Sequence, residues 1–575
     1  MTFKLAMTLK ELKDRTSKRK YKAIKFLSRD SREVKKLSKE DLMVLCYLTR
    51  AAKKIDEVHF KLEDYRNEEF LKFLNAEIEK GDKKAPLAKR MFLSQKSMFS
   101  PDSLGNQTVL AKGVVKLAGQ NYFPSDLSAE EFHQILNNMI DDGKIQEVKD
   151  ILNQRSIVVR DGKQLKAIDF VDAFPEFQEC AKELREAIKF STDKKFNEFL
   201  ELQAKALETA DPMLDAKADK AWAKLDRSKF EFTLTRECYD EVLTKTIFEN
   251  KALKEKLDSF GIEVYTKDNI GARVGIVNKS GTKLLKKLKE LIDVSAKFMP
   301  FKEEYENKGD DTKIEQTAVD VDLVTLTGEE GSYQASIVTA QNLPNDDKPA
   351  LKIGGGRRNV YHRQVRASVN KKLYKNIIAE DQFKYFNSEA DHWAVICHEN
   401  THTLGPKSGA KLGKFSAILE EYKADMGMYA FLDEFANEGY FSGEQIKEIM
   451  VTSLSRSFLK GKPSLSQAHR TRSVMICNRM LETKSIVLGE DGKLHFDFDK
   501  IKATTKKMMS EVVRLQIDAD VKKAEEYVSR WFVWTDEIAA VAEVIKAHSK
   551  MLNGHLVTPL ADEMLASDFE EKLNA

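Results

Sequence analysis

The chain has 575 residues, which exceeds the size at which one hydrophobic core stops growing, so we expect at least two lobes. Its hydrophobic content of 42% and charged content of 33% are typical of a well-solvated globular protein. The 95 Lys and Arg residues nearly balance the 92 Asp and Glu residues, and a formal net charge of +3 argues against a nucleic-acid partner.

Five cysteines lie far apart and form no CxxC pair, which excludes a zinc ribbon or a thioredoxin-like site. An odd number of widely spaced cysteines is typical of free thiols in a reducing compartment. Residues 1–20 contain no unbroken apolar stretch of the signal-peptide type, and no run approaches the roughly 18 apolar residues of a membrane span. We therefore expect a cytoplasmic protein with no membrane partner.

Residues 1–260 are predicted to be mainly helical, because apolar residues recur there at intervals of three and four. KEDLMVLCYLTRAAKKI is one such segment. The exception is RSIVVRDGKQLKAIDF (155–170), where Asp161-Gly162 lies between two β-rich runs and predicts a hairpin.

Residues 261–375 form a mixed segment that is rich in β-favouring residues. IEVYTKDNIGARVGIVNKSG and TAVDVDLVTLTGEEGSYQASIVTAQNLPNDD (317–347) contain alternating apolar positions and Gly turns, which predict a small sheet or barrel. Residues 376–575 are predicted to be helical again, apart from a hairpin in IVLGEDGKLHFDF (486–498). The chain thus divides into 1–260, 261–375 and 376–575.

The segment HENTH (398–402) fits the HExxH pattern of zinc peptidases. On a helix, His398 and His402 lie one turn apart on the same face, so both imidazoles can reach one metal ion. Glu399 lies beside that face, where its carboxylate can take a proton from a water. The pattern also arises by chance, and the polar Asn400 and Thr401 differ from the apolar pair that often fills the middle, so a pair of structural histidines stays open.

A second element follows in SAILEEYKADMGMYAFLDEF. A catalytic zinc needs three protein ligands, and Glu421 on this predicted helix completes a His₂Glu set. Glu421 and Asp425 share one helix face, so Asp425 is expected to accept a hydrogen bond from a ligand histidine. Glu420 is expected to point elsewhere and to lack such a partner. An ordinary charged helix face is the alternative interpretation of LEEYKAD.

These residues resemble the dipeptidyl-peptidase III family of zinc exopeptidases. The family has HExxH or HExxxH followed by EE-x-[RK]-A-[DE], which stands here as Glu420-Glu421-Tyr422-Lys423-Ala424-Asp425 before MGMYAFL. HENTHTLGP is similar to the HExxHGLGP of divergent bacterial members, with Thr403 in place of a glycine. The resemblance runs in order from about 260 to 480, whereas 1–250 matches only in being helical.

The resemblance also implies substrate-binding residues. NLPNDD (342–347) is similar to a family segment whose asparagines hold the N-terminus and backbone of a bound peptide, which implies Asn342 and Asn345. An E-x-Y stretch implies Glu263 as the carboxylate for the substrate ammonium group and Tyr265 as a hydrogen-bond donor near the scissile carbonyl.

Two assignments stay open within the resemblance. Glu237-Cys238-Tyr239 is a competing E-x-Y segment. Gln467-Ala468-His469 matches a family helix whose histidine lies in the active site, but Ser473 stands where an arginine is expected, with Arg472 adjacent.

The implied fold is α+β and mainly helical, with two lobes and a wide cleft. One helical lobe carries the zinc helices, and the lower lobe combines the N-terminal helices with a small β-barrel. The implied activity is Zn²⁺-dependent release of dipeptides from the free N-terminus of short peptides, with one Zn²⁺ per chain and a monomer or weak homodimer. The alternatives are another gluzincin-type amino- or endopeptidase, or a catalytically impaired peptide-binding relative.

Overall fold

A computed structural model describes residues 3–17, 21–101, 107–209, 211–225, 227–237, 242–305, 315–329, 340–343, 356–365, 371–465, 467–549 and 553–574. The chain forms two lobes, each with its own hydrophobic core. The first core is built from residues between Phe26 and Val365 and from the C-terminal segment, and the second from residues between Leu291 and Ile545. The expectation of at least two lobes is confirmed.

The first lobe is a layer of helices packed against a mixed sheet. The long helix α2 (Lys39–Glu63) packs on α8, on β7 and on β8. Its N-terminus is fixed by a capping box between Ser38 and Asp41. The helices of this lobe are α1 (Leu9–Arg15), α2, α3 (Asn67–Glu79), α4 (Ala85–Gln95), α5 (Ala129–Asp141), α6 (Ile145–Ile151), α7 (Phe170–Ala173), α8 (Glu176–Phe190), α9 (Lys194–Thr209), α10 (Pro212–Ala223), α11 (Lys245–Glu249), α12 (Lys251–Ser259), α25 (Pro559–Met564) and α26 (Phe569–Asn574).

The main sheet has the strand order β6-β7-β8-β10-β9. Its strands are β6 (Phe230–Glu237), β7 (Asn269–Val277), β8 (Glu315–Gly328), β9 (Ala340–Leu343) and β10 (Gly356–His362). Neighbouring strands are antiparallel except β8 and β10. Within the described residues this sheet is open at both edges, so the predicted barrel is not confirmed.

Four smaller pairs of strands lie outside the main sheet. The hairpins predicted at 155–170 and 486–498 are confirmed as β4 (Ser156–Asp161) with β5 (Gln164–Asp169), and β11 (Ile486–Leu488) with β12 (Leu494–Phe496). A third hairpin joins β2 (Phe99–Pro101) to β3 (Gln107–Val109). The fourth pair is parallel and joins β1 (Tyr21–Lys25) to β13 (Asn553–Val557), so the end of the chain returns to the first lobe.

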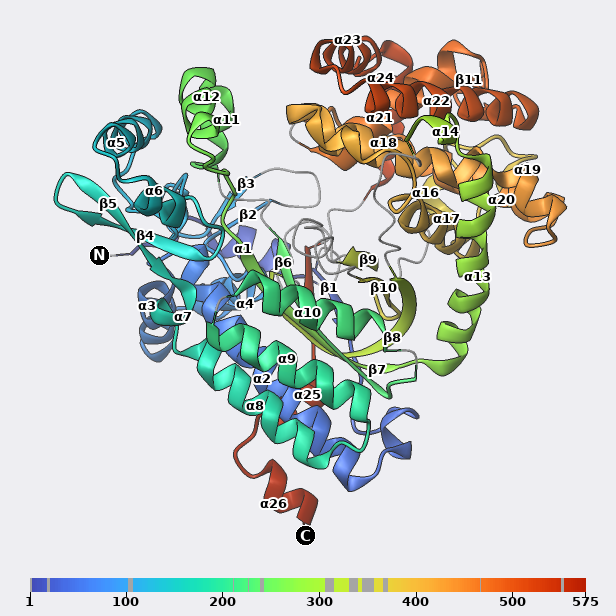
Figure 1. Cartoon of the computed structure of the whole chain (residues 1–575). Coiled ribbons are helices and arrows are strands. Elements are labelled where there is room, and N and C mark those ends of the chain that lie inside the picture. The colour runs from blue at the N-terminus through green and yellow to red at the C-terminus, as the bar shows by residue number, and fades with distance from the viewer. Residues whose placement is uncertain are drawn as a thin grey trace.

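The second lobe is helical. The long helix α13 (Lys279–Phe298) packs against β8 of the first lobe and against α17 and α19 of the second (Figure 1). The remaining helices are α14 (Lys302–Tyr305), α16 (Lys371–Tyr374), α17 (Ser388–Thr401), α18 (Ser416–Tyr429), α19 (Leu432–Asn437), α20 (Gly443–Ser457), α21 (Ala468–Glu482), α22 (Phe498–Asp518), α23 (Val521–Trp531) and α24 (Asp536–His548). In the described part of the chain, no helix combines the length and apolar character needed to span a membrane.

Candidate metal centre

The helix α17 presents the two histidines of HENTH. Its N-terminus is capped by Asn387, whose side chain accepts a hydrogen bond from the backbone N–H of Ala390 at 2.9 Å. His402 follows the last residue of α17 but keeps a helical backbone, with φ −56° and ψ −25°. His398 and His402 therefore keep the one-turn spacing that places both rings on one face.

A close approach of α17 and α18 brings the third residue to these histidines. Gly427 of α18 lies against Thr401, and a Cβ atom at position 427 would overlap the Thr401 side chain. Thr401 in turn donates from Oγ1 to the carbonyl of Cys397 at 2.7 Å. Thr401 is thus a contact point between α17 and α18, and position 427 requires glycine.

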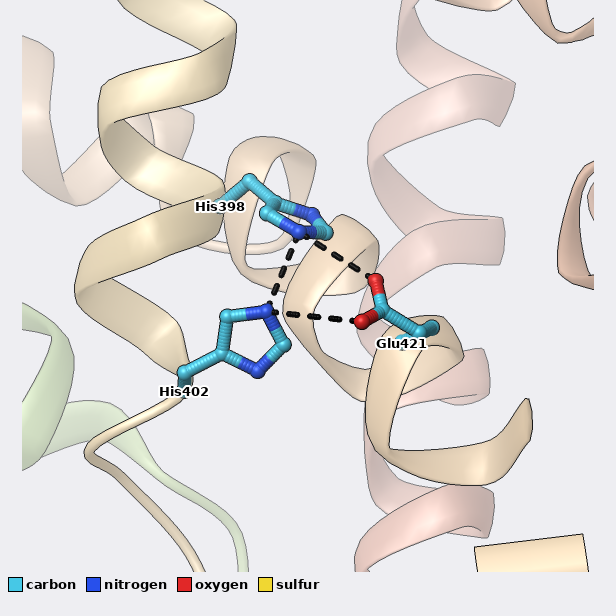
Figure 2. A group of neighbouring side chains, drawn as sticks. All are labelled: His398, His402 and Glu421. Atoms are coloured by element: carbon cyan, nitrogen blue, oxygen red, sulfur yellow. Dashed lines mark hydrogen bonds and ion pairs between the residues drawn. The ribbon is translucent and has the colours of Figure 1, made fainter. Parts of the chain in front are cut away.

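Three side chains converge where the two helices meet. Nε2 of His398 lies 3.1 Å from Nε2 of His402 and 3.3 Å from Oε2 of Glu421, and Nε2 of His402 lies 3.9 Å from Oε1 of Glu421. Figure 2 shows the two rings facing both carboxylate oxygens of Glu421. Two imidazole nitrogens and a carboxylate are a donor set for a divalent metal ion.

Both Nδ1 atoms are held by carboxylates. Nδ1 of His398 lies 2.8 Å from Oδ1 of Asp425, and Nδ1 of His402 lies 3.1 Å from Oε1 of Glu420. In the neutral ring, a proton on Nδ1 leaves the lone pair on Nε2, which is the tautomer that binds a metal. The expectation that Glu420 points away from the site is wrong, because its carboxylate reaches His402. Its carboxylate also accepts from Lys423 at 2.9 Å and from Gln516 at 3.0 Å, which turns it toward the cluster.

The electrostatics of the cluster favour a cation between its ligands. Burial alone would raise the pKa of Glu421, but hydrogen bonds from His398 and His469 hold it well below its usual range. Burial alone would lower the pKa of His398, but Asp425 and Glu421 raise it to about 10. Glu420 has a pKa lowered to about 2, because Lys423 and His402 outweigh its burial. A metal ion here would replace a proton that Asp425 and Glu421 otherwise hold on His398.

The distances fit a tetrahedral site. Ligand atoms at about 2.0–2.1 Å from Zn²⁺ are separated by about 3.3 Å along each edge of a tetrahedron. The two shorter separations, 3.1 and 3.3 Å, match this edge, and the third is longer at 3.9 Å. With both Nδ1 atoms already held, the residues present fit a metal ion.

Other predicted residues lie around this cluster. His469 of α21 places Nδ1 2.9 Å from Oε2 of Glu421, and 69% of its side chain is exposed. Arg472, whose role the sequence left open, forms an ion pair with Asp425 and lies 3.8 Å from Glu421. Glu399 is half-buried next to His398 on α17. The structure thus brings His398, His402, Glu421, Asp425 and His469 to one place, while their roles remain predictions.

The predicted residues Glu263, Tyr265 and Asn342 belong to the first lobe. Glu263 and Tyr265 lie between α12 and β7, where the Tyr265 hydroxyl donates to the exposed Glu263 carboxylate. Asn342 belongs to β9, where its backbone pairs with Asn359 of β10, and its side chain is not described. Asn345 lies outside the described residues. Of the competing segment, Glu237 ends β6, whereas Cys238 and Tyr239 lie outside the described residues.

Two solved structures share this architecture. The DPP III structure from Caldithrix abyssi has a TM-score of 0.78 and covers 95% of this chain and 98% of its own, at 20% identity. The dipeptidyl-peptidase III structure from Corallococcus sp. strain EGB has a TM-score of 0.77 and covers 99% of this chain and 100% of its own, at 20% identity. The chain has the dipeptidyl-peptidase III fold. The predicted resemblance is therefore confirmed at the level of the fold.

One curated protein also matches, and its name is not that of a dipeptidyl-peptidase. Nudix hydrolase 3 of Arabidopsis thaliana is 22% identical over 480 residues, which are 79% of this chain and 59% of the plant protein. This chain therefore matches little more than half of its plant relative. No protein-family model matches the chain.

Proposed function

We propose that this protein is a zinc-dependent dipeptidyl-peptidase, which removes dipeptides from the free N-terminus of short peptides. The observation that carries the proposal is the meeting of two imidazole Nε2 atoms with the Glu421 carboxylate, each ring held through Nδ1 by a further carboxylate. The dipeptidyl-peptidase III fold supports it. The name Nudix hydrolase describes a plant protein of which a large part lies outside the match, so it supplies no activity here.

In this proposal, His398, His402 and Glu421 hold Zn²⁺, and Asp425 and Glu420 orient the two rings. A zinc ion held there supplies Lewis acidity toward the scissile carbonyl and toward a water molecule. The carboxylate of Glu399, beside the ligand face of α17, takes a proton from that water and passes it to the leaving amine. His469 is exposed and contacts Glu421, and it or Tyr265 stabilises negative charge on the carbonyl oxygen.

The length of the product follows from where the substrate is held. In the proposal, Glu263 binds the free ammonium group of the peptide, while Asn342 and Asn345 bind its backbone. If the distance from Glu263 to the zinc spans two residues of an extended peptide, cleavage falls after the second residue. The peptide lies between the two lobes, and their closure would exclude water from the reaction. A cytoplasmic location and a monomer or weak homodimer belong to the same proposal.

A pair of peptides that differ only in N-terminal acetylation tests the proposal. We expect the purified wild-type protein to release dipeptides from the free peptide and not from the acetylated peptide. Internal cleavage of both peptides would indicate a gluzincin-type endopeptidase, and release of single residues would indicate an aminopeptidase. Zinc content without cleavage of either peptide would indicate an impaired peptide-binding relative.

A further inference from the structure

A second group of side chains that can bind a metal ion lies in the first lobe, away from α17 and α18. His59 and Glu63 are one turn apart near the C-terminal end of α2, and Glu329 directly follows β8. Each of the three offers one ligand atom, and these atoms lie within 4.8 Å of one another. One imidazole and two carboxylates are therefore brought together from segments more than 260 residues apart in the sequence.

Contacts at the end of β8 bring Glu329 to α2. Thr327 donates from Oγ1 to the Ala52 carbonyl at 2.8 Å, and the backbone N–H of Gly328 donates to Asp56 at 2.9 Å, so β8 ends against α2. Gly328 has φ +59°, a conformation that favours glycine. A Cβ atom there would overlap the Ile270 carbonyl of β7. The tight turn at Gly328 places Glu329 over α2.

Asn269, the first residue of β7, sets the tautomer of a neutral His59 ring. Its Nδ2 group donates to Oε2 of Glu329 at 2.7 Å and to Oε1 of Glu63 at 3.4 Å. Its Oδ1 atom therefore accepts, both from the Ile270 N–H at 2.9 Å and from Nδ1 of His59 at 2.8 Å. A neutral His59 thus carries its proton on Nδ1 and its lone pair on Nε2.

The hydrogen bonds around His59 do not account for its Nε2 atom. His59 is completely buried, and among the described residues Nε2 has no hydrogen-bond partner. Glu63 is also buried, at 5% exposure, and it accepts from Gln120 Nε2 at 3.1 Å. A buried lone pair without a donor is costly, and a metal ion beside two carboxylates would satisfy it.

We propose that His59, Glu63 and Glu329 bind a second divalent transition-metal ion, of the Zn²⁺ or Mn²⁺ class. Imidazole selects transition metals, and carboxylates accommodate the same ions. Neutral His59 and two carboxylates carry a formal charge of −2, which one divalent cation balances. The ion ties the end of α2 to the end of β8 and has a structural role. The inference does not depend on the peptidase activity.

Titration of metal-free protein with ZnCl₂ and, separately, MnCl₂ in a calorimeter tests this site. We expect the wild type to bind two equivalents of Zn²⁺. Glu329→Gln and His59→Gln should each bind one equivalent, while Glu329→Gln keeps dipeptide release within about twofold of the wild type. Chelator should lower the Tm of the wild type more than that of Glu329→Gln. Since Glu329 is only partly buried, Glu329→Gln remains a test even if His59→Gln fails to fold.

Two control variants separate metal binding from loss of a histidine or a carboxylate. His133→Gln removes a half-buried histidine of the same lobe that bonds Thr246 and Asn250, and Glu57→Gln removes a carboxylate of α2 that pairs with Lys54. Both should still bind two equivalents. The proposal is overturned if the wild type binds one equivalent that Glu329→Gln retains, or if Glu329→Gln binds two. Failure of the peptidase site would show instead as unchanged metal binding in Glu421→Ala, so the two outcomes are distinct.

Discussion

The two histidine–carboxylate clusters share a method of orienting imidazole and differ in their access to solvent. In both, Nδ1 is held by a carboxylate or amide oxygen, which leaves Nε2 as the nitrogen that can bind a metal. At the peptidase cluster, the His402 and Glu421 side chains are each 17% exposed and the neighbouring His469 is 69% exposed. At the first-lobe cluster, His59 is completely buried.

This difference is the one expected between a catalytic metal site and a structural one. A catalytic metal keeps an open position for water and substrate, whereas a structural metal is enclosed by its ligands. Cationic and polar groups also surround the peptidase cluster, including Lys423, His469 and Arg472, while neutral amides donate to the buried cluster. The comparison predicts that changes at the first cluster alter turnover, and that changes at the second alter stability.

The largest effect is expected at the proposed general base. Glu399→Gln keeps the size of the side chain and removes its basicity, so kcat should fall by about 10²- to 10⁴-fold with zinc content unchanged. Glu389→Gln, on the exposed first turn of the same helix, is the matched control and should leave kcat unchanged. Wild-type turnover in Glu399→Gln would remove that residue from the mechanism.

The carboxylates behind the histidines should have a smaller effect. Asp425→Asn and Glu420→Gln should each weaken zinc affinity by about 10- to 100-fold, measured by competition with a chromophoric chelator. Asp425→Asn should have the larger effect, because Asp425 is 1% exposed whereas the Glu420 side chain is 35% exposed. Equal affinity in the wild type and both variants would show that these carboxylates do not orient the ligands.

The close approach of α17 and α18 gives a paired test. Gly427→Ala places a methyl group against Thr401, so it should lower the free energy of unfolding by about 1–3 kcal/mol and weaken zinc binding. Gly443→Ala lies at the first turn of α20, where nothing approaches within 4 Å, and it should leave both quantities unchanged or slightly raise stability. If the two variants behave alike in urea denaturation and zinc titration, helix spacing does not control the site.

The last expected effect concerns stability alone, at the contact between α2 and the end of β8. Burial alone would raise the pKa of Asp56, but Lys96 and Lys53 hold it below its ordinary value. Asp56→Asn should therefore lower the free energy of unfolding by about 3 kcal/mol at pH 7. Because the folded-state pKa is lowered, this stabilisation is complete above about pH 4 and is lost as the pH falls further.

Urea denaturation at pH 7 and at pH 3 measures that change. The difference between the wild type and Asp56→Asn should shrink at the lower pH. Asp30→Asn is the control, because its 3.4 Å pair with Lys35 is exposed and should contribute little at either pH. A difference that grows at pH 3 would contradict the assigned sign.

What the sequence could predict was local. Helical spacing predicted that His398 and His402 share one face and that Glu421 and Asp425 share another. The three protein ligands that a catalytic zinc needs then predicted that the two faces meet. The two hairpins were also predicted locally, because Asp-Gly between two β-rich runs favours a tight turn. Strand β6 was missed, although Phe230, Phe232 and Leu234 alternate along it in the manner of a half-buried strand.

What the sequence could not predict depends on tertiary contact. Glu420 reaches His402 because Lys423 and Gln516 of another helix hold its carboxylate, and spacing along α18 does not show this. The parallel pair of β1 with β13 joins segments at opposite ends of the chain. His59, Asn269 and Glu329 likewise meet only once the sheet has formed, so no motif marked them.

The most direct test of the peptidase is the zinc content of the purified wild type beside Glu421→Ala, with dipeptide release assayed on the same samples. We predict near-stoichiometric zinc at the cluster of His398 and His402, and loss of one equivalent together with dipeptide release in the variant. Equal zinc content in the two proteins, or full dipeptide release by Glu421→Ala, would contradict the assignment of this cluster as the catalytic centre.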